Sequence, residues 1–239
     1  FRDVLITLGM LQEYYAKVLG IGQAKQVGLG FECAGVVTAV GEGVTEFAIG
    51  DRVMGLGVAE GTFANYITLP ASQMTHLPTH LSDAEAATLP MTFLTAWYGL
   101  VELAKLRAGE RVLIHAASGG GGMAAVQVAK GVDVVFNSLS ADFIDRSFAV
   151  LAKGGRFVEL GKIGIWSHDQ VTQHRPDAVY YPYDLGEALA KEPTLQARLW
   201  QCIIPKLHAG TFQPLPHTLF AAQEIVTAFR MMQQAKHLG

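Results

Sequence analysis

Four consecutive glycines, at positions 119–122, are the residues whose type and spacing point most directly to chemistry. They follow a short apolar run at 112–114, predicted to be a buried strand, and precede an alanine-rich segment at 123–130, predicted to be a helix. In such a unit the glycines let the backbone approach a phosphate, and the first helical N–H groups meet its charge. Ala116, Gly119 and Gly122 carry the pattern A-x-x-G-x-x-G, which indicates a dinucleotide site, although similar turns also occur without a ligand.

Polar residues follow two further predicted strands. Asn137 and Ser138 come after the strand at 132–136, and Gly161 and Lys162 end the strand at 156–160. Ligands of parallel sheets bind at the carboxyl ends of the strands, so these residues could line the edge of a cofactor. The alternative is that each pair is only a turn.

Two adjacent tyrosines, Tyr14 and Tyr15, lie in a predicted helix at 11–19 and could donate protons to a substrate. Adjacent helical residues point in different directions, so at most one of the rings shares the face of Leu11. The alternative is an amphipathic helix with one buried ring.

Metal binding has little support in this sequence. His76 and His80 have i, i+4 spacing, but Pro78 between them interrupts the helix that would align their side chains. Cys33 is expected to pack in the core, and no cluster of cysteines has the spacing of a structural metal site. Asp51, in the turn after Gly50, is expected to cap that turn.

The pattern of elements divides the chain. Residues 30–41, 52–54 and 62–69 are predicted strands separated by glycine turns, with Pro70 ending the last, so the first 80 residues suggest a small β domain. Ser82 and Glu85 form a capping box that opens a helix interrupted by Pro90, and a second helix is predicted at 91–106. Strands and helices then alternate from Val112 to Leu160, which is typical of an α/β fold. A loop is predicted at 163–183, followed by helices at 194–208 and 221–236.

Composition excludes several classes of function. The 239 residues are half hydrophobic and carry 18 Lys and Arg against 21 Asp and Glu, without a basic block, which argues against nucleic acid binding. No apolar run approaches the roughly 18 residues of a membrane span. With only two cysteines, far apart, a cytoplasmic location is the default expectation.

One feature disagrees with a complete dinucleotide fold. A doubly wound sheet has about six strands, with a residue that binds the adenosine ribose about 20 residues beyond the glycines. Here the next acidic residue, Asp133, comes too early and lies inside a strand pattern. Either the domain is unusually small, or a block of sequence is missing between Lys130 and Gly131.

Several long motifs resemble one family, in order along the chain. They are FRDVLITLGM at 1–10, GFECAGVVTAVGEGV at 30–44, GDRVMGL at 50–56, LPMTFLTAWYGLVELAKLRAGERVLIHAASGG from Leu89, VDVVFNSLS, GGRFVELGK and the terminal FRMMQQAKHLG. The chain resembles the enoyl reductase domain of modular type I polyketide synthases. These domains are zinc-independent members of the medium-chain dehydrogenase/reductase superfamily and are related to quinone oxidoreductases.

The resemblance implies a fold and its boundaries. Residues 1–88 would form a GroES-like, β-rich substrate domain whose first strands are missing. Residues 89–205 would form a doubly wound Rossmann domain with a segment absent at 130/131, and residues 206–239 would return to the substrate domain. The family carries a valine where this chain has Gly121. Phe31 stands where zinc-dependent relatives have the histidine of a His-Glu pair, so Glu32 would hold no metal.

The resemblance also implies an activity, the NADPH-dependent reduction of a trans-2-enoyl thioester on an acyl carrier protein, among neighbouring polyketide synthase domains. Thr95, as part of FLTAWYG, would lie beside the nicotinamide, or else be an ordinary buried helix threonine. The cofactor-binding set would be Thr95, Ala116, Gly119, Gly120, Gly122, Asn137, Ser138, Gly161 and Lys162. The catalytic candidates are Lys162, Tyr14 and Tyr15, with further family residues, a lysine and an aspartate among them, in the absent segment.

Two other functions remain open. A stand-alone quinone reductase of the same superfamily would turn over small quinones. A catalytically dead domain would bind cofactor, or nothing, and serve the architecture of a larger protein.

Overall fold

Two compact units make up the chain, unit 1 with Phe1–Met91 and Pro193–Gly239, and unit 2 with Thr92–Glu192. The computed structural model describes residues 2–11, 13–14, 16, 28–57, 61–117, 119–128, 133–139, 142–162 and 164–234. The division differs from the expected boundaries at helix α9 (Leu195–His208), which falls in unit 1. Its Gln196 side chain donates to the carbonyl of Gln73 at 2.5 Å, and its apolar face is buried.

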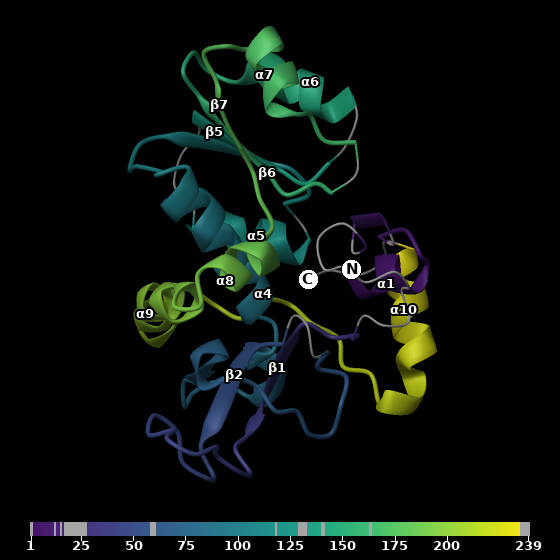
Figure 1. The fold of residues 1–239 in the computed structure, drawn as a ribbon, viewed down its shortest axis with the longest axis vertical. Helices are drawn as coiled ribbons and strands as arrows, with labels where there is room; N and C mark the ends of the chain where they lie inside the picture. Colours follow the sequence, from purple (N-terminus) through teal and green to yellow (C-terminus); the bar gives the residue numbers. More distant parts are fainter. Residues whose placement is uncertain are drawn as a thin grey trace. The chain divides into compact units, whose positions relative to one another are not determined.

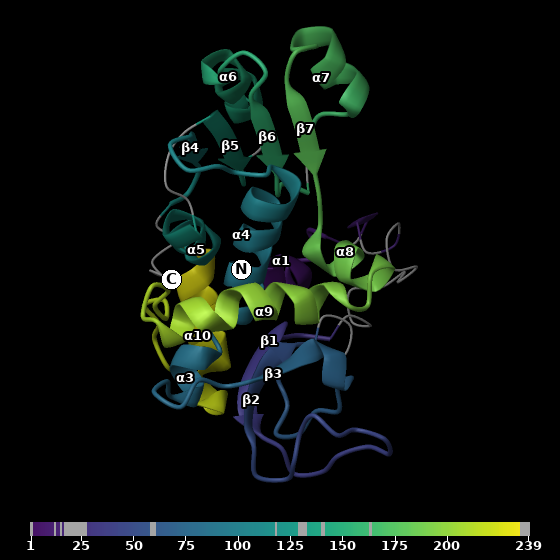
Figure 2. The ribbon, with the colours of Figure 1, turned by 90° about the vertical axis from the view of Figure 1, so that its left-hand side faces the viewer.

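The sheet of unit 1 is small and antiparallel, with the order β1-β2-β3 (Figure 2). Its strands are β1 (Glu32–Val36), β2 (Arg52–Leu56) and β3 (Met74–His76), and Cys33 lies opposite Gly55. The turn before β2 is capped as predicted, because the Asp51 carboxylate accepts the Ala48 N–H at 2.8 Å. The strand predicted at 30–41 is shorter than expected, since β1 begins at Glu32 and ends at Val36.

The strand predicted at 62–69 is wrong. The segment forms no strand, although the N–H groups of Thr62 and Phe63 donate to the carbonyls of Gly30 and Leu29, each at 3.0 Å. The Thr62 hydroxyl also donates to the carbonyl of Glu32 at 2.8 Å. The start of this segment is thus hydrogen-bonded to the residues just before β1, but the pairing does not extend into a strand.

Unit 1 also contains helices from both of its chain segments. These are α1 (Arg2–Thr7), the 3₁₀ turn η2 (Ala71–Gln73), α3 (Asp83–Ala86), α9, the 3₁₀ turn η4 (Ala222–Glu224) and α10 (Ile225–Gln233). The predicted capping box of α3 is confirmed, with Ser82 and Glu85 exchanging both hydrogen bonds. No helix within the described ranges is long and apolar enough to cross a membrane.

Unit 2 is built on a parallel sheet (Figure 1), and its strands lie in the order β4-β5-β6-β7 (Figure 2). The strands are β4 (Arg111–Ile114), β5 (Asp133–Asn137), β6 (Arg156–Glu159) and β7 (Val179–Pro182). The connecting helices are α5 (Gly120–Val128), α6 (Asp142–Val150) and α7 (His168–His174), and α8 (Leu185–Lys191) follows β7. Each strand is short, apolar and followed by a helix, which is how parallel sheets are covered.

Different elements cover the two faces of this sheet. On one face α6 and α7 pack on Val135, Phe157 and Tyr180, with the Phe148 ring stacked on Phe157 at 4.3 Å between centroids. On the other face, space near Phe136 is filled by the π-helix η3 (Tyr98–Leu103), which continues from α4 (Pro90–Trp97). The helix predicted at 91–106 is thus an α-helix over Pro90–Trp97 that continues as a π-helix over Tyr98–Leu103. It begins at Pro90 because proline is well suited to the first turn of a helix.

The loop predicted at 163–183 is wrong in part, because it contains α7 and β7. Ser167 and Gln170 form a capping box that opens α7, with the Ser167 hydroxyl accepting the Gln170 N–H. The Trp and Tyr residues that suggested an irregular segment are instead core residues: Trp166 packs on Phe148 and Tyr180 lies in the sheet.

Candidate functional site

The carboxyl ends of the four parallel strands bring most of the candidate residues of unit 2 to one edge of the sheet. Ala116 follows β4, Asn137 ends β5, Gly161 and Lys162 follow β6, and Asp184 follows β7. This is the edge at which open α/β sheets bind ligands. The residues nevertheless differ in whether their polar groups are free to meet a ligand.

The glycine turn after β4 brings the start of α5 close to the end of the strand. Ala116 adopts φ +52°, a left-handed conformation, and its carbonyl accepts the Gly119 N–H at 2.9 Å. A Cβ at Gly122 would lie 2.3 Å from that carbonyl oxygen, so only glycine allows α5 to begin this close to the turn. A Cβ at Gly121 would meet nothing within 4 Å, so the valine that the family resemblance implies at this position would have room.

These residues fit a pyrophosphate. Helix α5 begins at Gly120, three residues earlier than predicted, so Gly120 and Gly121 contribute N–H groups of its first turn. Backbone N–H groups at a helix N-terminus suit an anion, and the open face at Gly121 leaves it room.

A buried polar chain joins the ends of β4, β5 and β6. His115 Nδ1 donates to Asn137 Oδ1 at 2.6 Å, and Asn137 Nδ2 donates to Glu159 Oε2 at 2.7 Å. Glu159 Oε1 accepts the Gly161 N–H at 2.6 Å. Burial raises the pKa of the Glu159 carboxyl, and the hydrogen bonds from Asn137 and Gly161 oppose that rise. The Asn137 amide also bonds Leu139 through both its atoms, so its side chain is directed at the protein.

Lys162 is held by the end of β7 and the start of α8. Its Nζ donates to the carbonyl of Tyr183 at 2.7 Å and lies 3.2 Å from Asp184 Oδ2. The side chains of Lys162 and Asp184 are 19% and 7% exposed, so the pair is largely shielded from water. Asp184 also caps α8 by accepting the Glu187 N–H at 3.0 Å. Sequence reasoning missed Asp184; the D-x-x-E spacing with Glu187 was the available signal for the cap.

Thr95 and Tyr183 are connected within unit 2. The Tyr183 hydroxyl donates to the Thr95 carbonyl at 2.7 Å, and burial raises the pKa of that hydroxyl well above its usual value. Gly99 makes this packing possible, since a Cβ there would lie 2.5 Å from the Tyr183 oxygen. Thr95 itself is half-buried in α4.

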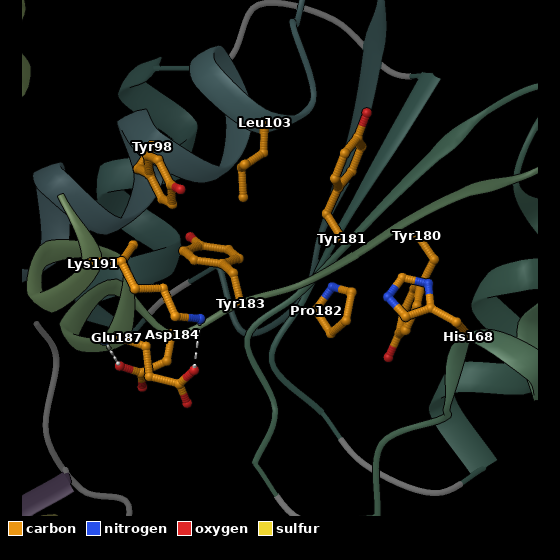
Figure 3. Close-up of a pocket in the computed structure, with 11 residues that line it drawn as sticks. Tyr98, Leu103, His168, Tyr180, Tyr181, Pro182, Tyr183, Asp184, Glu187 and Lys191 are labelled. Atoms are coloured by element: carbon orange, nitrogen blue, oxygen red, sulfur yellow. Dashed lines mark hydrogen bonds and ion pairs between the residues drawn. The ribbon is translucent and has the colours of Figure 1, made fainter. Parts of the chain in front are cut away.

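A pocket of about 310 Å³ opens between η3, β7 and α8 (Figure 3). Figure 3 shows the Tyr98 and Tyr183 rings on one side of it and Tyr180 with His168 on the other. Asp184 lines the pocket as well, so one wall is continuous with the Lys162 ion pair.

Of the remaining candidates, Ser138 follows β5 at this same edge, whereas Tyr14 lies in unit 1. Ser138 is exposed, with its hydroxyl 3.5 Å from the His115 carbonyl. Tyr14 is half-buried in unit 1 against a cluster of Ile6, Leu11 and Phe31. Tyr15 lies outside the described residues. The structure thus gathers the unit 2 candidates at one edge, whereas Tyr14 packs in unit 1.

The position that holds zinc in some dehydrogenases does not fit a metal. Phe31 is buried in the apolar cluster, and the Glu32 carboxylate accepts the Met91 N–H at 2.8 Å. Burial raises the pKa of Glu32 to about 7. His76 bonds the carbonyl of Glu46 instead, and no group of three potential ligands occurs in the described part of the chain.

Two family descriptions match the sequence. The zinc-binding dehydrogenase family matches residues 119–239, and the alcohol dehydrogenase GroES-like domain matches residues 3–79. The chain is similar to the polyketide synthase GfsB of Streptomyces halstedii, with 35% identity over an alignment of 280 residues that covers all of this chain and 5% of the synthase. The chain therefore spans a small part of this curated relative.

Solved structures are similar as well. The CurK enoyl reductase has 43% identity and a TM-score of 0.93, covering 100% of this chain and 85% of that one. The Escherichia coli quinone oxidoreductase complexed with NADPH has 20% identity and a TM-score of 0.75, with 96% and 86% covered, and shares the fold.

Proposed function

The chain belongs to the enoyl reductase domains of polyketide synthases, in the medium-chain dehydrogenase/reductase superfamily, and we propose that it reduces trans-2-enoyl thioesters carried on an acyl carrier protein. One observation carries the proposal. The shielded Lys162–Asp184 pair lies at the same carboxyl edge of the sheet as the glycine turn, so one edge offers both a phosphate cradle and a held cation.

The proposed hydride donor is NADPH, the nucleotide in complex with the similar quinone oxidoreductase of Escherichia coli. When bound, it would supply a hydride to the electron-deficient β-carbon of the conjugated thioester. Gly119, Gly120 and Gly122, with the turn at Ala116, would hold its pyrophosphate. Thr95, Ser138, Gly161 and Lys162 are proposed for the nicotinamide end, where Asn137 could contribute only its backbone.

Lys162 is the proposed proton donor. Addition of a hydride at the β-carbon moves the π electrons of the double bond to the thioester oxygen, giving an enolate. The Lys162 ammonium would stabilise that charge and then transfer a proton to the α-carbon, after which solvent returns a proton to the amine. Asp184 is a positioning residue in this scheme, since its carboxylate lies 3.2 Å from the ammonium and holds it near the Tyr183 carbonyl.

The test is to incubate the intact protein with NADPH and a crotonyl thioester and follow the loss of NADPH absorbance. Turnover is expected for the parent protein, and Lys162→Met should lower kcat about a hundredfold, the usual contribution of a general acid. Asp184→Asn should shift the pH profile as well as lower kcat, because it changes the environment of the ammonium. Lys153→Met is the matched control, since Lys153 is exposed in the turn that precedes β6, away from the carboxyl ends of the strands.

No oxidation by a demonstrably folded parent protein would overturn the proposal. Turnover with a small quinone but not with the thioester would support a quinone reductase, and cofactor binding without any turnover would support a structural domain. Repeating the assay with the thioester attached to an acyl carrier protein tests the proposed partner. The KM for the carrier-bound thioester should be lower than the KM for the free thioester.

A further inference from the structure

Tyr183, the residue that follows β7, contacts two groups of the proposed site at once. Its hydroxyl donates to the Thr95 carbonyl in α4 at 2.7 Å. Its own carbonyl accepts a hydrogen bond from Lys162 Nζ, also at 2.7 Å. One residue therefore connects the helix proposed for the nicotinamide end with the ammonium proposed for proton transfer.

The backbone of Tyr183 is fixed by the sheet and by α8. Its N–H donates to the carbonyl of Glu159, at the end of β6, at 3.1 Å, and the next residue, Asp184, is the N-cap of α8. Asp184 also lies 3.2 Å from Lys162 Nζ. The ammonium is thus held by two consecutive residues whose positions are set by neighbouring elements.

The ring of Tyr183 occupies a space that depends on a glycine. A Cβ at Gly99 would lie 2.5 Å from the Tyr183 hydroxyl oxygen and 3.0 Å from the Phe136 ring. The Tyr98 ring packs edge-on against the Tyr183 ring, with the centroids 5.5 Å apart (Figure 3). Burial raises the pKa of the Tyr183 hydroxyl well above its usual value, so the group stays protonated and remains a donor.

The contact to Thr95 lies near a change of helical type. At Tyr98 the α-helix gives way to the π-helix η3, in which the Ala104 N–H donates to the carbonyl of Gly99, five residues earlier. Such π segments are rare and are frequent at functional sites. In this chain the π segment contains the glycine that makes room for the Tyr183 ring.

We propose that Tyr183 is a positioning residue that sets the separation between the nicotinamide and the proton donor. Its hydroxyl would hold α4, and with it Thr95, at a fixed distance from the Lys162 ammonium. One bound thioester could then receive the hydride at its β-carbon and the proton at its α-carbon without a change of position. The inference rests on the proposed function, since it takes Thr95 and Lys162 as the two ends, and it deepens that function by naming the residue that joins them.

Removing only the hydroxyl tests this inference. Tyr183→Phe keeps the ring and the carbonyl that Lys162 contacts, and it breaks the bond to Thr95. With NADPH bound in advance and a crotonyl thioester added, the single-turnover rate should fall about tenfold, less than for Lys162→Met, because the ammonium remains in place. The KM for the thioester and the dissociation constant of NADPH, from dihydronicotinamide fluorescence, should each stay within about twofold of the parent values.

Tyr181→Phe is the matched control. It removes a hydroxyl from the same strand and the same pocket, and Figure 3 shows that hydroxyl pointing away from Tyr183. The single-turnover rate of this variant should stay within about twofold of the parent rate, since the contact to Thr95 is intact.

A second variant approaches the same contact from the helix. Gly99→Ala places a Cβ against the Tyr183 hydroxyl and should lower the single-turnover rate at least as much as Tyr183→Phe. Adding Tyr183→Phe to Gly99→Ala should lower the rate no further, because both changes break one contact. Urea denaturation of each variant gives the folded fraction, and rates are expressed per folded protein.

The outcomes separate this inference from the proposed function. If the parent protein reduces the thioester, three results would overturn only the inference: a parent-like rate for Tyr183→Phe, an equal loss for Tyr181→Phe, or additive losses in the double variant. A tenfold rise in KM or in the NADPH dissociation constant would also overturn it, because the hydroxyl would then act in binding. A folded parent protein that reduces no thioester would overturn both, since there would be no transfer for Tyr183 to position.

Discussion

The glycine turn after β4 and the polar chain across β5 and β6 lie at the same edge of one sheet but differ in how their polar groups are used. At the turn, Gly121 faces open space at the first turn of α5. In the polar chain, Asn137 and Glu159 are completely buried and bonded to one another. The difference shows that a polar residue at a strand end is not by itself a ligand contact. The turn leaves open space beside the start of a helix, whereas the polar chain holds the strand ends together.

The largest expected effect separates two neighbouring glycines of the turn. Gly122→Ala places a Cβ against the Ala116 carbonyl and should lower the free energy of unfolding by about 2 to 3 kcal/mol. Gly121→Ala is the matched control and should stabilise the protein by up to about 1 kcal/mol, because it enters open space in a helix. Urea denaturation of both variants measures the difference, and equal stabilities would contradict the packing described for the turn.

The next effect tests the polar chain. Glu159→Ala leaves the Asn137 amide and the Gly161 N–H without their acceptor and should cost about 2 kcal/mol of unfolding free energy at neutral pH. Glu159→Gln, which keeps one acceptor oxygen, should cost less. Urea denaturation at pH 7 compares the two, and an Ala variant as stable as the parent would refute a structural role.

The pH dependence follows from the direction of the Glu159 pKa shift. Because burial raises the pKa, the folded state binds more protons than the unfolded state just above the ordinary carboxyl pKa, and stability falls as pH rises through that window. Glu159→Gln replaces the carboxyl with an amide, which binds no proton in this pH range. The stability advantage of the parent over Glu159→Gln should therefore shrink as the pH rises above the ordinary carboxyl pKa, with Glu32 titrating equally in both proteins; urea denaturation at a series of pH values measures it.

A smaller effect tests the turn as an anion site. Gly121→Asp adds a negative charge to the first turn of α5, where it should repel a bound pyrophosphate and weaken nucleotide binding about tenfold. Gly121→Asn has nearly the same shape without the charge and should change binding much less. The two dissociation constants are compared by nucleotide fluorescence, and equal values would place the phosphate away from this turn.

The smallest effect concerns Ser138. Its exposed hydroxyl lies 3.5 Å from the His115 carbonyl, so Ser138→Ala should change the unfolding free energy by less than about 0.5 kcal/mol. Because the stability of Ser138→Ala is expected to be unchanged, any change in its nucleotide affinity reports a lost contact between the Ser138 hydroxyl and the ligand. A loss of affinity with unchanged stability would assign Ser138 a ligand contact, in contrast to the buried Asn137 beside it.

Local signals in the sequence predicted much of the fold. The apolar runs located β4, β5 and β6, and the Ser82–Glu85 spacing located α3. Ser167 and Gln170 have the same capping-box spacing at the start of α7, but the aromatic and polar composition around them suggested a loop instead of a helix. The segment at 62–69 alternates apolar and polar residues but forms no strand. Such alternation indicates which side chains would face the core, but it does not supply a neighbouring strand to pair with.

The candidate site was harder to predict than the elements. The glycine turn is local, so its residues could be named from spacing alone. The contact between Lys162 and Asp184 joins residues on either side of β7, and no local pattern reports it. Asn137 was a reasonable candidate by position, but which way its amide faces depends on His115 and Glu159, which reach it from neighbouring strands.

The consecutive strand order also has a consequence for how unit 2 acquires its structure. Arg111 lies opposite Asp133, Val134 opposite Arg156 and Arg156 opposite Val179, so each pairing closes a loop of only about twenty residues. Parallel sheets usually form slowly because their contacts are distant in the sequence. In this unit, pairing can proceed from one strand to the next as the chain emerges, and refolding kinetics should be faster than those of a doubly wound sheet of similar size.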